Sequence, residues 1–306
     1  MWFKNLLTYR MTQDVSLTCE ALEEALRSKP ARKPESQVLQ TVGFISPSSK
    51  NPEAPLAHKV EGVYLLALRT YDRLLPPSAV ADELAEKVEE IETSQARKVY
   101  KKEKDQLKDE IIQSMLPRAF IRKKTTYAAL DLVNKLIFVN TSSAIAAEAL
   151  LSTLREVVGS LPVRPVTVKI APTATFTDWV KNGQAAENFY VLNNCTLKDP
   201  DEDGGEINVK NQDLTSDEIK QLIASGKVVT KISLAYKDLV SFSLNDKLSV
   251  QGLRFESLLQ EKAVQDGGDE KDGQFDASFL LMMATLNEVV PQLLTVLGGE
   301  EISQGL

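Results

Sequence analysis

The sequence predicts an α+β protein with mostly antiparallel sheets and a projecting charged helical segment. Expected strands and helices follow one another without the steady alternation that a parallel sheet requires. Three expected strands (228–236, 239–244 and 248–255) are separated by short turns, which is typical of antiparallel pairing. The segment 78–116 combines abundant charge with thin apolar seams, and such helices usually project from a body or pair with another helix.

A chain of 306 residues is long enough for two folded regions. We predict a first α/β region from 1–76 and 118–162, which is one discontinuous domain if its strands share a sheet. Residues 77–117 form the projecting helical segment. Residues 163–306 form a second α+β region with a long C-terminal helix.

The elements of the first region follow from local apolar patterns and turn residues. In order we expect a strand over 2–10, a helix over 16–29, a strand over 60–68, a strand–turn–strand unit over 127–140 and a helix over 143–158. In the projecting segment, Pro77 and Ser78 suit a helix start, Val80, Leu84, Val88 and Ile91 share one helix face, and Pro117 ends the segment.

The second region begins with a short helix over 175–183 and a strand over 189–196. Residues Thr215-Ser-Asp-Glu218 form a capping box that starts a helix ending near Gly226. The three strands listed above follow, and an acidic, Gly-rich loop over about 265–274 precedes the last helix. That helix has an apolar stripe from Phe279 to Leu297, and Pro291 should kink it.

The inventory of reactive side chains excludes several kinds of site. His58 is the single histidine, and Cys19 and Cys195 lie far apart, so neither a zinc site nor a disulfide framework is expected. We therefore predict no metal, no cofactor and a reducing compartment, the cytoplasm. The run 279–297 contains Asn287, Glu288, Pro291 and Gln292, and we expect it not to span a membrane.

Enzymatic motifs are lacking, and we predict that the protein is not an enzyme. The best enzymatic alternative is a metal-dependent nuclease. It would use the carboxylates Asp201-Glu202-Asp203, or Glu218 with Lys220 in the acid-x-Lys spacing. A solvated turn and a helix cap explain the same residues.

A basic segment spans residues 97–124 and contains ten basic and four acidic side chains in a chain of net charge −7. Arg97, Lys101, Lys104 and Lys108 follow helical spacing and would line one face of a helix, along which a nucleic-acid backbone can run. Lys98 is included in this predicted surface by position. The alternative is a solvated face with internal ion pairs, because acids are interleaved.

The residues after Pro117 strengthen the nucleic-acid interpretation. Arg118, Arg122, Lys123 and Lys124 lie in a less acidic stretch, and Phe120 stands among them. An exposed aromatic beside basic residues can stack, wedge or pack on a partner, whereas a buried Phe120 would only begin a strand. Contacts would go mainly to phosphates, so binding would be sequence-tolerant and salt-sensitive.

Six blocks distributed along the chain are distinctive: WFKNLLTYR (2–10), QARKVYKKEKDQLKDE (95–110), LPRAF (116–120), QDLTSDEI (212–219), GKVVTKISL (226–234) and FDASFLLM (275–282). Together they resemble the RdgC family of recombination-associated proteins. The resemblance implies a ring-shaped, head-to-head homodimer with a positively charged central hole. It further implies sequence-independent DNA binding with a preference for duplex, restraint of RecA by competition for DNA, association with the nucleoid, and no catalytic activity or cofactor.

The resemblance also implies roles for individual residues. Arg97 corresponds to a position facing DNA, Phe120 to a dimer contact, and Gln212 to the other end of the ring. The family often has a basic residue directly before this glutamine, where this chain has Asn211 preceded by Lys210. We therefore group Lys210, Asn211 and Gln212 as a second dimer contact. Three hypotheses remain: a DNA-encircling dimer, a protein scaffold acting directly on RecA, and the nuclease.

Overall fold

The computed structural model describes residues 1–15, 17–51, 53–201 and 204–302. The helices are α1 Cys19–Arg27, α2 Pro77–Gln95, α3 Lys101–Met115, α4 Ala144–Val158, α5 Pro172–Asn182, α6 Asp217–Ala224, α7 Ser257–Gly267 and α8 Lys271–Val296. The strands are β1 Asn5–Met11, β2 Gln40–Ile45, β3 His58–Val60, β4 Val63–Leu74, β5 Phe120–Asp131, β6 Leu136–Val139, β7 Val163–Pro165, β8 Phe189–Lys198, β9 Glu206–Val209, β10 Val228–Tyr236, β11 Val240–Asn245 and β12 Val250–Phe255.

All twelve strands belong to one sheet in the order β2-β4-β5-β6-β1-β12-β11-β10-β8-β9, with β3 on β4 and β7 on β1. Every pairing between these strands is antiparallel. The predicted α+β class with mostly antiparallel pairing is therefore confirmed. The two halves of the sheet meet at β1, where Asn5 pairs with Gln251 and Leu6 with Val250.

Two apolar cores lie against the sheet because its strands alternate buried and exposed side chains. The smaller core packs α1 and α4 on the β1–β6 half, through residues such as Leu26 and Leu154. The larger core packs α5, α6 and α8 mainly on β8–β12, with Phe242 and Met282 among its fully covered members. The domain limits given above remain a prediction.

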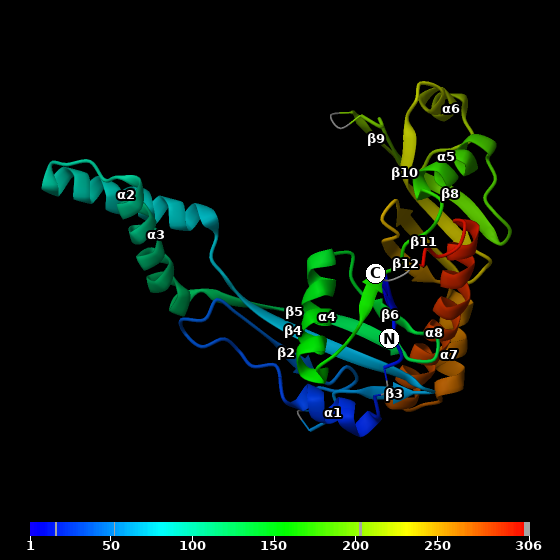
Figure 1. The fold of residues 1–306 in the computed structure, drawn as a ribbon, viewed down its shortest axis with the longest axis horizontal. Coiled ribbons are helices and arrows are strands. Elements are labelled where there is room, and N and C mark those ends of the chain that lie inside the picture. Colours follow the sequence, from blue (N-terminus) through cyan, green and yellow to red (C-terminus); the bar gives the residue numbers. More distant parts are fainter. Residues whose placement is uncertain (16, 52, 202–203, 303–306) are drawn as a thin grey trace.

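The predicted projecting segment is present and forms a helical arm, defined here as α2, α3 and the loop between them. β4 and β5 pair along their whole length, up to Leu74 opposite Phe120, and the arm begins beyond this end (Figure 1). α2 buries only Val80 and α3 only Ile111. The chain is a crescent with the arm at one end and β9 near the other (Figure 1).

Several local predictions need correction. α2 ends at Gln95, where Ala96 takes a left-handed conformation (φ 49°), so Arg97 lies in a loop and does not share a helix face with Lys101. The predicted capping box does not form: Ser216 occupies the position before α6 without a side-chain cap hydrogen bond, and the Thr215 hydroxyl donates to Asp213 at 2.7 Å. Residues 257–267 form helix α7, which was not predicted, and α8 begins inside the expected acidic loop.

Helix α8 is long and apolar enough, by length and composition alone, to cross a membrane. The argument that it is too polar to do so is therefore not supported. Its apolar side chains instead fill the larger core, with Phe279 and Met282 fully buried. The apolar stripe is thus explained by packing against the sheet.

Candidate nucleic-acid interface

The three lysines that were predicted on the arm are all exposed to solvent, as are Lys102 and Lys108. Lys98 lies in the loop between the helices, and Lys101 and Lys104 lie in the first turns of α3. Within the described parts of the chain, none of the three forms an ion pair. The spacing of three residues puts Lys101 and Lys104 on one side of α3, as predicted. Their ammonium groups are therefore available to a phosphate backbone.

Arg97 is exposed but already engaged. Its guanidinium donates to both carboxylate oxygens of Glu103, at 2.7 and 2.6 Å, and its Nε donates to Gln95 at 2.7 Å. The hydrogen bonds with Glu103 raise the pKa of Arg97 and lower the pKa of the Glu103 carboxyl. A phosphate that binds Arg97 has to replace this carboxylate. Arg97 therefore lies beside Lys98, but the Glu103 carboxylate competes with a phosphate for its guanidinium.

The basic residues after Pro117 are divided between a turn and the two faces of strand β5. Arg118 is exposed in the short 3₁₀ turn Leu116–Arg118, whereas Lys123 lies on β5. Side chains alternate along a strand, so Lys123 faces away from its neighbours Arg122 and Lys124. Arg122 also contacts Asp72 of β4 at 3.3 Å. The structure does not bring these cations together with the lysines of α3 into one patch.

Phe120 is 84 % exposed, so the alternative of a buried strand residue is wrong. It begins β5 opposite Leu74, which is itself 41 % exposed, and directly paired residues share a face of the sheet. Phe120 and Leu74 therefore form an apolar patch at the arm end of the sheet, whereas Ile121, 39 % exposed, lies on the other face. Exposed apolar patches with a polar rim are typical of protein contact sites.

The second predicted contact lies at the other end of the crescent. Residues 210–212 follow β9, and Lys210, Asn211 and Gln212 are all exposed. Their backbone is fixed because Asn211 N donates to Asn194 Oδ1 and Gln212 N donates to the Asn193 carbonyl. The three side chains are therefore presented on an ordered turn, far from Phe120 (Figure 1).

A partly buried arginine was missed by the sequence analysis. Arg73, near the end of β4, donates to the carbonyls of Leu116 and Ala119 with one nitrogen and to those of Pro34 and Glu35 with the other. It thereby ties the base of the arm to the sheet and to the 34–39 loop. Sequence patterns indicate this role only weakly, because Arg73 is one of several polar residues at the end of an apolar strand.

The residues considered for chemistry have structural partners. His58 Nε2 lies 2.7 Å from Asp276 Oδ1 and its ring meets Phe275 edge-on. Burial raises the pKa of the Cys195 thiol to about 11. Of the predicted carboxylate cluster, Glu202 and Asp203 lie outside the described residues. Among those described, no group of three or more His, Cys, Asp or Glu side chains is placed to hold a metal ion.

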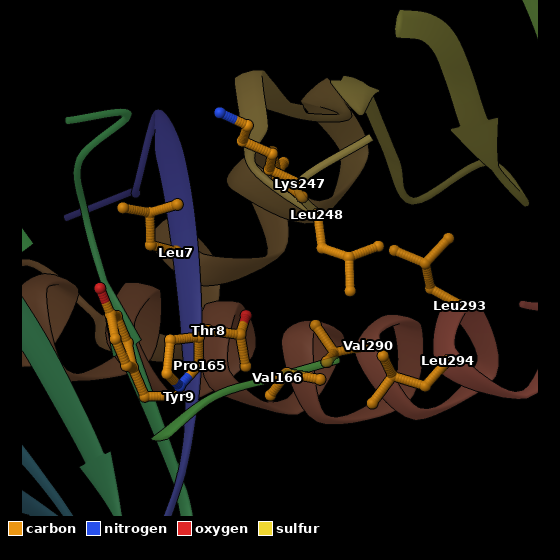
Figure 2. Close-up of a pocket in the computed structure, with 11 residues that line it drawn as sticks. Leu7, Thr8, Tyr9, Pro165, Val166, Lys247, Leu248, Val290, Leu293 and Leu294 are labelled. Atoms are coloured by element: carbon orange, nitrogen blue, oxygen red, sulfur yellow. The ribbon is translucent and has the colours of Figure 1, made fainter. Parts of the chain in front are cut away.

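The pKa of Glu218 is lowered by hydrogen bonds from its own backbone and from Ser216, in keeping with a place at the start of a helix. A small cavity of about 60 Å³ lies between β1, β7 and α8, next to the turn before β12 (Figure 2). Leu248, Val290 and Leu293 line it, and the ammonium of Lys247 points away from it. An apolar hollow of this size is a packing feature.

Comparisons with known proteins agree with these observations. The family model described as "Putative exonuclease, RdgC" matches residues 1–300. Proteins named recombination-associated protein RdgC are similar over the full length of both chains, with 60 % identity for Pseudomonas syringae, 61 % for Pseudomonas putida and 57 % for Pseudomonas aeruginosa. The chain therefore belongs to the RdgC family of recombination-associated proteins.

Proposed function

We propose that the protein binds duplex DNA without sequence preference and does so as a homodimer that closes into a ring. The observation that carries the proposal is a group of exposed arm lysines that form no ion pair with any described residue; it includes Lys98, Lys101 and Lys104. Ammonium groups at this spacing can contact successive phosphates, and phosphate contacts carry no sequence information. Binding should therefore depend strongly on salt and weakly on sequence.

The ring is inferred from the shape of the chain and the position of its two predicted contacts. The apolar patch lies at the start of β5, where the arm joins the sheet, and the turn 210–212 follows β9 in the other half of the crescent (Figure 1). Two copies related by a two-fold axis can join like to like at both ends, which closes the assembly without leaving an open edge. A closed ring turns modest phosphate contacts into long residence, because release requires an open interface or a free DNA end.

We further propose that the protein restrains RecA-dependent recombination by occupying DNA, and that it acts in the cytoplasm on the nucleoid. Support comes from membership of a recombination-associated family and from the arm lysines. A direct contact with RecA is the alternative. A DNA competitor loses its effect when the arm lysines are neutralised, whereas a scaffold that binds RecA through another surface retains it.

The first experiment is fluorescence anisotropy with labelled duplex across a salt series, with unlabelled duplexes of unrelated sequence as competitors. We expect a steep loss of affinity with salt and equal competition by every sequence. Linear and closed circular DNA are compared next, because a ring should leave a linear duplex faster. No binding at low salt would refute the DNA-binding proposal.

A second candidate function is exonuclease activity, which the description of the matching family model favours. We propose that the protein is not an enzyme and uses neither a metal nor another cofactor. End-labelled duplex is incubated with the protein and Mg²⁺ and separated on a denaturing gel. Shortened products that co-purify with the protein and disappear with EDTA would overturn the non-enzymatic proposal.

A further inference from the structure

The strands β8–β11 are covered on one face only. One face packs on α5, α6 and α8 through residues such as Ile232 and Phe242. In the described part of the chain, no helix packs on the opposite face, and α8 lies along the outer side of the crescent (Figure 1). The open face carries mostly small polar and basic side chains: Asn194, Thr196, Lys198, Asn208, Lys231, Ser233, Ser243 and Asn245. Tyr190, which pairs with Ala235 and is 60 % exposed, lies on the same face at the other end of β8.

This face is hollowed into a continuous trough. Two adjoining depressions of about 340 and 220 Å³ share Thr196, Asn208 and Lys231 in their lining. They cross from β9 over β8 and β10 to β11, three steps between strands, or roughly 14 Å at the usual strand spacing. About four phosphates of one DNA strand fit along such a length.

The charges in the trough favour an anion. Among the described residues, three lysines line the trough: Lys198, Lys210 and Lys231. Two acidic residues, Glu206 and Asp246, line it as well, so the lining has one more positive than negative charge in a chain of net charge −7. The Glu206 carboxylate already accepts a hydrogen bond from Asn208 at 3.0 Å. Lys231 Nζ donates a hydrogen bond to the neutral side chain of Gln251 at 2.7 Å. Among described residues, neither Lys231 nor Lys198 forms an ion pair with an acidic side chain.

The side chains also distinguish between kinds of nucleic acid. Lysine, serine, threonine and asparagine are the residues that typically contact phosphate and sugar. Among the described residues, no aromatic ring lines the trough itself, although aromatic platforms are the usual means of holding single-stranded bases. The trough therefore suits the outside of a duplex.

We propose that this open face is a second DNA site, which holds the sugar–phosphate backbone of duplex DNA through Lys198 and Lys231. The proposal rests on the DNA-binding function proposed above and adds a contact surface in the half of the chain distant from the arm. DNA that binds both the arm lysines and the trough would contact each half of the crescent.

The test compares Lys198→Gln, Lys231→Gln and the double variant with the parent protein in the anisotropy salt series. Each lost phosphate contact should lower the steepness of log K against log salt by about 0.9. Lys220→Gln is the matched control, since Lys220 is an exposed lysine of α6, which packs on the covered face. Asn208→Asp adds a carboxylate at an exposed position without changing side-chain size, and it should weaken binding several-fold.

Each outcome decides one question. Unchanged slopes in the trough variants, together with a lower slope for arm variants, would overturn the second site and leave the proposed function intact. An absence of DNA binding by the parent protein would refute the function itself. Thermal melting verifies that each variant is folded. Loss of dimers in sedimentation, with the salt slope retained, would identify the trough as a self-association surface and also overturn the proposal.

Discussion

The arm lysines give the most direct quantitative prediction. In the double variant Lys101→Gln, Lys104→Gln, two positive charges are removed while side chains of similar polarity remain. Both lysines are exposed and unpaired among described residues, so folding should not change. The loss of DNA binding can then be attributed to lost phosphate contacts.

The size of the effect follows from helix geometry. Lys101 and Lys104 are three residues apart, or about 4.5 Å along the axis of α3. Phosphates of one DNA strand rise about 3.4 Å per nucleotide, so the two ammonium groups can reach neighbouring phosphates. Two contacts correspond to about 1.8 in the slope of log K against log salt, or about twelve-fold in affinity over a four-fold change in salt. The slope change doubles to about 3.6 if both copies of a dimer contact the DNA.

The assay is anisotropy with one labelled duplex between 50 and 200 mM salt, a range over which the cited slope applies. Lys87→Gln is the control, because Lys87 lies on the acidic helix α2 of the same arm. We expect the control to match the parent protein. An unchanged slope in the folded double variant would show that the arm does not carry the DNA contacts.

Four further predictions concern other described residues. Glu103→Gln should release Arg97 and steepen the salt dependence by up to about 0.9, and an unchanged slope would mean that Arg97 does not reach DNA. Arg73→Met should leave the carbonyls that Arg73 binds without a partner, at a cost of about 1–3 kcal/mol in the free energy of unfolding. The melting temperature should fall and the arm should become more mobile, and faster amide hydrogen exchange in the 96–100 loop would report this mobility. Phe120→Ser should weaken the dimer in sedimentation without lowering the melting temperature, because Phe120 is exposed; equal dimer stability would exclude the Phe120 contact. Because burial raises the pKa of Cys195, the folded protein favours the neutral thiol. The thiol's contribution to the free energy of unfolding is therefore complete below pH 9 and falls as the pH rises toward 11. At pH 8 a thiol reagent should modify Cys195 only when the protein unfolds.

Local pattern predicted most elements of the fold. The apolar run 60–68 marked the buried part of β4, and the Ala- and Leu-rich run 143–158 corresponds to α4 almost to the residue. Helix α7 was missed because it has no apolar stripe to reveal it: only Ala263 is buried, whereas Leu258 is 75 % exposed. The joining of both halves into one sheet was also not predictable, since it depends on pairing between β1 and β12, far apart in sequence.

The candidate site was predictable where one short segment supplies it. Lys101, Lys104 and Phe120 are all exposed, as their predicted surface roles require. The engagement of Arg97 by Glu103 depends on a loop that helical spacing did not reveal. The trough could not be predicted from local patterns because four separate strands each contribute only two to four of its residues.

The position of β1 has a consequence for how the chain folds during synthesis. This strand is synthesised before all of its neighbours in the sheet, which are β6, β7 and β12. Leu6 can pair only after Val250 has been synthesised, and the guanidinium of Arg10 can bind the Glu300 carboxylate, which Arg164 also binds, only later still. Pairings of such high sequence separation form slowly, because a long loop must close before the contacts form. Growing chains should therefore expose an incomplete sheet edge at β1 until β12 has been synthesised, and a chaperone that shields such edges should raise the yield of folded protein.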